Sequence, residues 1–421
     1  MSLKPFLKED AQFDFVLIGN AENVLRNLPL SLKLSGFRVL GIAPPQSTLL
    51  RNKNLTSTIE IDGLSTLEFV TNLKSIESFL KKSNACFLWS SDEIMKVVAE
   101  SNLDLYCKKN ILPIKNQEFW RIFDSKAAQS QTFYFLGVRQ PKTKIYEKAK
   151  NSITEDWEVE SRVLLKGNSS GGGAFIHEFD RVEDIDLEGI NSNWFPISVQ
   201  EFIAGKDLMV DAYFKNGELV LALASETLAE TTKFGPSVAR RYLDECPIEA
   251  VKTLSSLGRE LKVNGFVNVT FRSCSQSEQL YLIEFDARPN IWHGVFYELE
   301  IPFGEIWVNG GELQGKSKII ASDFYDPLRL FNWSLEKGRI SEAIKAMKGN
   351  SSTHFGAPLA TEFVFENRGC RGWVKILLAP IYPFRQKILK KLIRVKSRLP
   401  QTQREFIDQS NIKRALLRIL N

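Results

Sequence analysis

Along the first quarter of the chain, short apolar runs alternate with segments whose apolar side chains recur every three or four positions. The first pattern is typical of buried strands and the second of amphipathic helices. Strands that alternate with helices predict a parallel, doubly wound sheet. The expected strands are residues 13–18, 37–42, 57–61 and 85–89, and the expected helices are residues 21–34, 67–80 and 91–101.

The pattern changes after residue 113, where strand-like alternation becomes more common than helical spacing. Strand-rich segments span about 146–203, 208–223 and 266–285. Asn216 and Gly217 stand between two alternating runs, which is the sequence signature of a tight hairpin. A chain of 421 residues exceeds what one hydrophobic core usually organises. We therefore expect four regions, at residues 1–113, 114–203, 204–366 and 367–421.

Composition places the chain among globular proteins, because 43% of its residues are apolar and 25% are charged. The N-terminal residues lack the pattern of a signal peptide, and no apolar run approaches the roughly 18 residues needed to span a bilayer. The five cysteines are scattered without a Cys-x-x-Cys pair, which argues against a zinc knuckle or a disulfide framework. We expect a protein of the reducing cytoplasm.

Positive charge is concentrated at the C-terminal end. Residues 367–421 hold 14 Lys and Arg against 2 Asp and Glu, a net charge of +12. Because the whole chain carries +5, residues 1–366 carry −7. Residues 386–399 alternate apolar and basic side chains as an amphipathic helix does. Such a helix can lie on the anionic inner face of a membrane, or it can pack on the acidic remainder of the chain or on a second subunit. No nucleic-acid reading motif accompanies the charge, so we expect no nucleic-acid partner.

The most distinctive segment is Lys166–Gly173, which reads Lys-Gly-Asn-Ser-Ser-Gly-Gly-Gly directly after an apolar run. Glycines let backbone N–H groups approach an anion closely, and the lysine adds a positive charge at the same place. A polyphosphate is the ligand that suits such a loop. In a P-loop the lysine follows the glycines, so this segment is a different phosphate-binding device. An ordinary turn between two strands is the alternative interpretation.

A second apolar run carries two carboxylates. Glu284 and Asp286 are separated by one residue, so in a strand both side chains point to the same face. Their neighbours Leu282, Ile283 and Phe285 are apolar, which argues against a plain solvated strand. Two carboxylates together with phosphate oxygens are ligands that Mg²⁺ prefers, so the pair predicts a magnesium site.

Several such segments follow one another in a fixed order. They are residues 124–126, 136–143, 166–173, 199–207, 266–271 and 282–290. In this order and spacing they resemble the ATP-grasp superfamily, and within it the carboxylate–amine ligases similar to the carbamoyl-phosphate synthetase large chain and biotin carboxylase. The resemblance covers roughly residues 14–305.

The resemblance implies an α/β protein with a parallel, doubly wound pre-ATP-grasp domain at residues 1–113. A two-subdomain ATP-grasp fold would follow, with the glycine-rich flap in residues 114–203 and the metal site in residues 204–366. The basic helical tail at residues 367–421 would come last. The resemblance also implies ATP and Mg²⁺ as cofactors, with Mn²⁺ as the alternative metal.

The resemblance further implies roles for single residues. Lys126 and Lys166 match the family's two phosphate-contacting lysines. Gln200 matches the position whose side chain meets the exocyclic amine of adenine, and Asp207 matches the position that meets the ribose hydroxyls. The implied nucleotide-binding residues are Lys126, Lys166, Ser169, Ser170, Gly171, Gly172, Gly173, Gln200, Glu201, Phe202, Ile203 and Asp207; the implied metal ligands are Glu284 and Asp286; the implied catalytic cations are Arg288, Lys233 and Arg241.

The implied reaction is a two-step ligation. A substrate carboxylate attacks the γ-phosphorus of Mg-ATP to give an acyl phosphate, and an amine then displaces phosphate to give an amide. Thr270 departs from the family, which often has Gln, Asp or Glu at this position, and this weakens one metal position. A second interpretation is therefore a nucleotide-binding, membrane-associated or scaffolding protein without turnover. The identity of the small-molecule carboxylate and amine stays open.

Overall fold

The computed structural model describes residues 12–19, 24–25, 27–63, 65–148, 153, 157, 162–169, 171–173, 175–301, 303–304, 306, 322–339 and 357–358. All of them belong to one compact unit, Met1–Val364. The predictions for Ser170 and for the basic tail at residues 367–421 lie outside the described residues.

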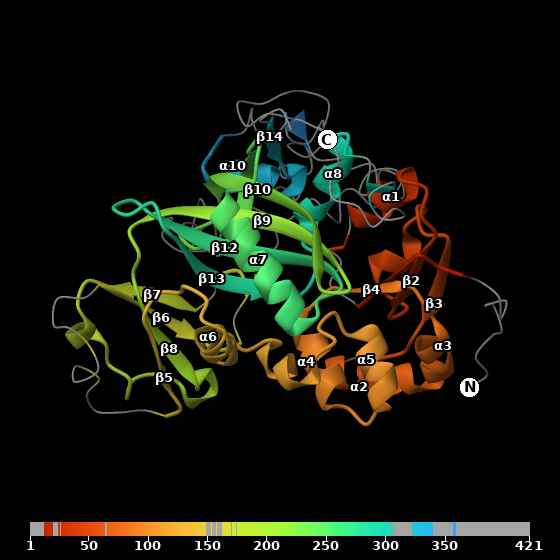
Figure 1. Cartoon of the computed structure of the whole chain (residues 1–421), viewed down its shortest axis with the longest axis horizontal. Coiled ribbons are helices and arrows are strands. Elements are labelled where there is room, and N and C mark those ends of the chain that lie inside the picture. Colours follow the sequence, from red (N-terminus) through yellow and green to blue (C-terminus); the bar gives the residue numbers. More distant parts are fainter. Residues whose placement is uncertain are drawn as a thin grey trace, which may run out of the picture. The chain divides into compact units, whose positions relative to one another are not determined.

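The first sheet is the parallel one that the sequence predicts (Figure 1). Its strand order is β3-β2-β1-β4, and every neighbouring pair is parallel. β1 and β4 are buried at every position, which explains their unbroken apolar runs. The elements are β1 (Phe15–Ile18), α1 (Leu28–Leu34), β2 (Val39–Ala43), η1 (Thr48–Arg51), β3 (Ser57–Glu60), α2 (Thr66–Asn72), η2 (Leu73–Ile76), α3 (Glu77–Lys82), β4 (Cys86–Trp89), α4 (Asp92–Glu100) and α5 (Leu105–Ile111).

A second sheet is antiparallel and has the order β5-β8-β6-β7. Its inward side chains form a small core of their own, which includes Tyr146, Val163 and Val199. The elements of this region are η3 (Gln117–Ile122), α6 (Lys126–Phe135), β5 (Thr143–Tyr146), β6 (Val163–Gly167), β7 (Ile176–Phe179), η5 (Val182–Asp184), η6 (Ser192–Trp194) and β8 (Ile197–Glu201).

The third sheet has seven strands in the order β13-β12-β9-β10-β11-β14-β15. The predicted hairpin joins β9 to β10, and Asn216 and Gly217 both have the positive φ that a tight hairpin turn needs. All its strand pairs are antiparallel except β14 with β15. The elements are β9 (Gly205–Lys215), β10 (Glu218–Glu230), β11 (Ser237–Tyr242), α7 (Ile248–Leu261), β12 (Gly265–Cys274), β13 (Leu280–Asp286), η7 (Ile291–Gly294), α8 (Val295–Glu298), β14 (Ser322–Tyr325), α10 (Pro327–Glu336) and β15 (Ala357–Pro358).

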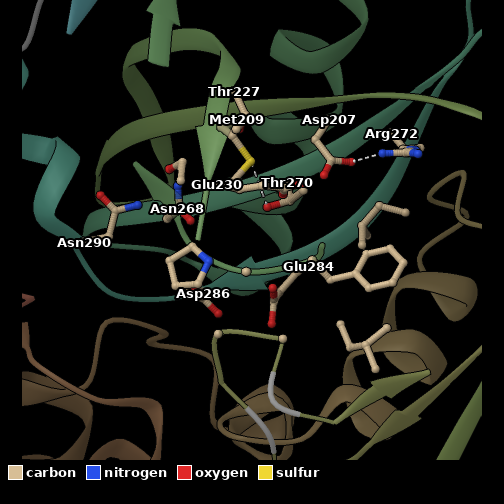
Figure 2. A pocket seen from close by; sticks show the side chains of 18 of the residues that line it. Asp207, Met209, Thr227, Glu230, Asn268, Thr270, Arg272, Glu284, Asp286 and Asn290 are labelled. Carbon is tan, nitrogen blue, oxygen red and sulfur yellow. Dashed lines mark hydrogen bonds and ion pairs between the residues drawn. The ribbon is translucent and has the colours of Figure 1, made fainter. Parts of the chain in front are cut away.

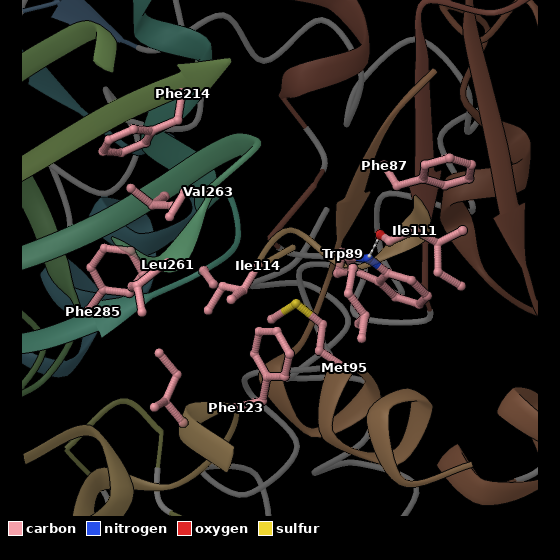
Figure 3. Packing of buried hydrophobic residues seen from close by; sticks show 14 of the residues in the cluster. Phe87, Trp89, Met95, Ile111, Ile114, Phe123, Phe214, Leu261, Val263 and Phe285 are labelled. Atoms are coloured by element: carbon pink, nitrogen blue, oxygen red, sulfur yellow. Dashed lines mark hydrogen bonds between the residues drawn. The ribbon is translucent and has the colours of Figure 1, made fainter. Parts of the chain in front are cut away.

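The parallel sheet and the seven-stranded sheet share their hydrophobic core. Gly265 at the start of β12 has a φ of +115°, and a Cβ there would lie 3.2 Å from Leu88 Cδ2 of β4. The two sheets therefore approach each other closely at this glycine. Figure 3 shows side chains of both regions meeting, and they include Trp89, Met95, Ile111, Ile114, Phe123, Leu261, Val263 and Phe285. Among the described residues, no helix has the length and apolar character to cross a membrane.

We predict that Leu17→Ala lowers the free energy of unfolding by about 2–5 kcal/mol, because Leu17 is fully buried between the two sheets. Leu67→Ala is the matched control. Leu67 is 66% exposed on α2, so its replacement should change stability by less than about 0.5 kcal/mol. Urea unfolding of both variants checks this, and equal effects would contradict the shared core.

Candidate functional site

A cavity of about 290 Å³ lies against one face of the seven-stranded sheet. Strands β6 and β8 and the start of α6 supply another part of its lining. Of the residues singled out from the sequence, those that line it are Lys126, Lys166, Gly172, Gly173, Gln200, Glu201, Phe202, Ile203, Asp207, Glu284, Asp286 and Arg288. Within the described part of the chain, Ser169, Gly171, Lys233 and Arg241 do not line it.

The floor of the cavity is made by alternate residues of β9, β12 and β13, because side chains two apart on a strand share a face. Strand register places these residues in three rows, which Figure 2 shows in sequence from Asp207 and Arg272 to Asn268 and Asn290. The first row pairs Asp207 with Arg272; the second joins Met209, Thr270 and Glu284; the third joins Asp211, Asn268 and Asp286.

Lys126 and Glu284 form an ion pair in the cavity. Lys126 is the first residue of α6, whose N-terminus is capped by the Ser125 hydroxyl. Its Nζ lies 3.1 Å from Glu284 Oε1. Burial tends to lower the pKa of Lys126, yet the Glu284 carboxylate raises it above the ordinary value. The lysine is therefore charged, and its partner is the residue that the sequence predicts as a metal ligand.

Lys166 is buried on β6, and its side chain bonds to a residue of the neighbouring strand β8. The residue is 5% exposed, and its Nζ donates a 2.6 Å hydrogen bond to Gln200 Oε1. Gln200 Nε2 in turn donates to Thr143 Oγ1 at 3.1 Å. Gln200 thus holds the lysine, whereas the resemblance implied a contact with adenine. Burial lowers the pKa of Lys166 to about 8, so the lysine is still mostly charged at pH 7 and loses its proton in the mildly alkaline range.

Arg288 lies between two carboxylates from distant parts of the chain. Its Nη2 is 3.2 Å from Asp286 Oδ2, and its Nε donates to Asp92 Oδ2. Asp92 is the first residue of α4, in the parallel-sheet region. Burial raises the pKa of Asp286 to about 8 despite the arginine. The sequence gives no sign of Asp92, because Asp92 and Arg288 are 196 positions apart.

The expected adenosine-binding segment, residues 199–207, runs from the end of β8 into the start of β9. Asp207 Oδ1 accepts a 2.8 Å bond from Arg272, whose Nε also donates to the Ile203 carbonyl at 3.0 Å. The Arg162 guanidinium lies 4.2 Å from the centroid of the Phe202 ring. Arg272 was missed in the sequence, although its position two residues after Thr270 on a strand puts it on the same face.

The glycine-rich loop packs against the loop between β10 and β11. Gly172 and Gly173 have φ values of +61° and +73°, and a Cβ on Gly173 would lie 2.2 Å from the Phe234 carbonyl oxygen. Asn168 anchors the start of the loop, since its Oδ1 accepts from Ser125 Oγ and from the Ala127 N–H, both at 3.0 Å. The glycine-rich loop can therefore lie against the Phe234 carbonyl only because Gly173 has no side chain there.

Two cations implied by the resemblance lie elsewhere. Lys233 pairs with Glu178 of β7 at 2.5 Å and is 68% exposed. Arg241 binds both carboxylate oxygens of Asp323, at 2.7 and 2.9 Å. Its neighbour Arg240 lines the cavity instead, because adjacent strand residues face opposite sides. The sequence identified this basic pair but not which of its members faces inward.

The two carboxylates that the sequence predicts as metal ligands, Glu284 and Asp286, both line the cavity. Within the described ranges, no group of three or more His, Cys, Asp or Glu side chains is arranged to hold a metal. Thr270 donates to Met209 Sδ at 3.4 Å. Glu284 and Asp286 share a face, with Glu284 directly opposite this threonine and Asp286 opposite Asn268. Two carboxylates fit Mg²⁺ only when a ligand supplies further oxygens.

The fold has counterparts among solved structures, whereas no protein-family model and no curated protein matches the sequence. N5-carboxyaminoimidazole synthetase from Staphylococcus aureus, complexed with ADP, aligns at a TM-score of 0.58 and 12% identity, over 89% of this chain and 99% of that chain. Phosphoribosylglycinamide synthetase from Anaerococcus prevotii aligns at 0.51 and 15%, over 74% and 80%. N5-carboxyaminoimidazole ribonucleotide synthetase from Thermotoga maritima aligns at 0.50 and 15%, over 74% and 79%.

These structures have the ATP-grasp fold. The present chain has that fold too, as the order of its motifs predicts. At such low identity the likeness concerns the fold alone, and the roles of the cavity residues depend on the geometry described above.

We predict that Lys166→Met differs from the wild type in a pH-dependent way. The folded-state pKa is about 8 against an ordinary value of 10.5, so the unfolded chain binds more protons between these values. As the pH rises from 8 towards 10.5, the free energy of unfolding of the wild type should therefore increase relative to that of the variant, by at most about 1.4 kcal/mol per pH unit. Urea unfolding at pH 7.5, 8.5 and 9.5 measures this. A constant difference between the two proteins would show that Lys166 is not desolvated.

Proposed function

We propose that the protein is an ATP-dependent ligase, which activates a substrate carboxylate as an acyl phosphate and joins it to an amine. The observation that carries the proposal is the convergence of Lys126, Lys166, Glu284, Asp286 and Arg288 in one cavity of an ATP-grasp fold. The structural neighbour from Staphylococcus aureus is complexed with ADP, which supports a nucleotide as the ligand.

The nucleoside would lie at the end of the cavity that holds the segment 199–207. Backbone groups of Glu201 and Ile203 would meet adenine, and Asp207 would accept bonds from the ribose hydroxyls. Arg272 already holds both Asp207 and the Ile203 carbonyl, so it fixes the spacing between the two contacts. The positioning role of Arg272 is inferred from these two hydrogen bonds and not from the family resemblance.

The phosphates would lie over the middle row of the floor, between the two lysines. Lys126 and Lys166 would neutralise their charge, and Arg288 would do so at the acyl-phosphate end. Glu284 and Asp286 would hold Mg²⁺, which neutralises and orients phosphate oxygens when it is bound. Lys126 would then exchange part of its contact with Glu284 for phosphate. Catalysis by positioning and charge neutralisation needs no nucleophilic side chain from the protein.

Water must be kept from an acyl phosphate, and the two loops at Gly173 and Phe234 suit this task. They already touch, and Lys233 adds an ion pair to Glu178 beside them. Lys233 would thus hold the closed loops together and would not contact the substrate. The exclusion of water also strengthens every charge interaction inside the cavity.

The alternative is a nucleotide-binding protein without turnover. It is favoured by Thr270, which offers a hydroxyl where a third carboxylate would complete the metal site. Both proposals require nucleotide binding, and only the first requires phosphate release that depends on a pair of substrates.

We predict phosphate release from Mg-ATP only in the presence of a matching carboxylate and amine. Pools of each would be screened with purified protein. Lys166→Ala and Glu284→Ala should abolish turnover, because they remove a phosphate contact and a metal ligand. Tight ATP binding without turnover in any pool would favour the alternative. Retained turnover in both variants would rule out this cavity as the active site.

We also predict that Gly173→Ala impairs ligation whereas Gly171→Ala does not. Alanine at 173 would clash with the Phe234 carbonyl and strain a left-handed backbone, so the loops could not close. At Gly171 a Cβ meets nothing within 4 Å. We expect a fall in kcat of at least about tenfold for the first variant, with ATP lost to hydrolysis in preference to amide formation. Equal effects of the two substitutions would contradict the closing role of this contact.

A further inference from the structure

The third row of the floor lies at the opposite end from Asp207, and its member Asp286 is one of the two proposed metal ligands. Asp211 stands four residues after Asp207 on β9, which is roughly 13 Å along a strand. In the register of the sheet Asp211 is level with Asn268 and Asp286. The third row is therefore the part of the floor farthest from the proposed ribose contact at Asp207.

Asp211 is a buried carboxylate that holds a cation in this row. It is 2% exposed and accepts hydrogen bonds from Tyr242 Oη at 2.7 Å and from Asn268 Nδ2 at 2.9 Å. Its third partner is Arg240, whose Nη1 lies 3.1 Å from Asp211 Oδ2. His293 Nδ1 is 3.8 Å from the other carboxylate oxygen. A buried carboxylate with this many donors fixes the arginine in one orientation.

Arg240 faces the cavity with donors to spare. Its Nε donates to Ser237 Oγ at 2.8 Å, and its guanidinium lies 4.8 Å from the centroid of the Trp292 ring. A guanidinium has five N–H donors, and the bonds to Ser237 and Asp211 come from Nε and Nη1, so among the described residues Nη2 donates no bond. Within the described part of the chain, the Trp292 indole N–H has no hydrogen-bond partner, and Trp292 also lines the cavity.

A second guanidinium reaches the same place from α10. Arg329 Nη1 donates to the Ser237 carbonyl at 2.9 Å, and Arg329 lines the cavity. Two arginines from different elements are thus tied to one residue, Ser237, through its hydroxyl and its carbonyl. Arginine forks are suited to bidentate binding of a carboxylate or a phosphate.

We propose that Arg240 and Arg329 form a subsite for a second anionic group on the ligase substrate, distinct from the carboxylate that is activated. The substrate of this class carries two acidic groups, such as a dicarboxylate or a phosphorylated carboxylic acid. The proposal rests on the proposed function, which uses Lys126, Lys166 and Arg288 for the reacting phosphates and carboxylate and assigns no role to Arg240 and Arg329.

The test measures binding of matched ligands to protein saturated with Mg-ADP. Glutarate, its neutral-ended monoamide glutaramate and 3-phosphoglycerate would be titrated by calorimetry. A dianion should bind at least tenfold more tightly than glutaramate, and the better of the two dianions names the anionic group. Arg329→Met and Arg240→Lys should each remove this preference, and neither should weaken Mg-ADP binding.

Arg241→Met is the matched control, because Arg241 is the neighbour on β11 that binds Asp323 outside the cavity. It should leave the preference unchanged. Equal affinity for dianions and glutaramate in the wild type would overturn the proposal, as would an undiminished preference in Arg329→Met. Failure to bind Mg-ADP would instead count against the proposed function, so the two failures are distinguishable.

Discussion

The register of β12 between β9 and β13 is the constraint on which the candidate site depends. The polar groups in the three rows of the cavity floor come from alternate residues of these three strands. A slip of one residue would turn Asn268, Thr270 and Arg272 to the opposite face and replace them with Val269 and Phe271. The apolar set on that opposite face is buried in the core shared with the parallel sheet. Packing of the core therefore also fixes the chemistry of the cavity.

Most of the positively charged side chains in the cavity are already paired with carboxylates of the protein itself. Four of its cations have carboxylate partners, in the pairs Lys126 with Glu284, Arg288 with Asp92, Arg240 with Asp211, and Arg272 with Asp207. Lys166 differs from them, since its contact is the neutral amide of Gln200. A buried cation without a carboxylate is costly, and a phosphate oxygen would relieve that cost. The cavity is therefore poised for an anion chiefly at Lys166.

Much of the fold could be predicted from the sequence, because periodicity separates buried strands from amphipathic helices. The Asn-Gly hairpin and the face shared by Glu284 and Asp286 follow from local rules alone. Sheet order and the partners of each cation could not be predicted, because they depend on contacts between distant segments. Asp92 shows this for Arg288, and Gln200 shows it for Lys166.

The bond between Asp92 and Arg288 has a consequence for how the protein is made. Chains grow at about 5–20 residues per second, so Asp92 leaves the ribosome roughly 10–40 seconds before Arg288 does. The first sheet has its strands complete by residue 89 and can form in that interval. During this interval the Asp92 carboxylate at the start of α4 has no arginine partner, because Arg288 has not yet been synthesised. The cavity is thus completed only after Arg288 has been synthesised, late in the growth of the chain.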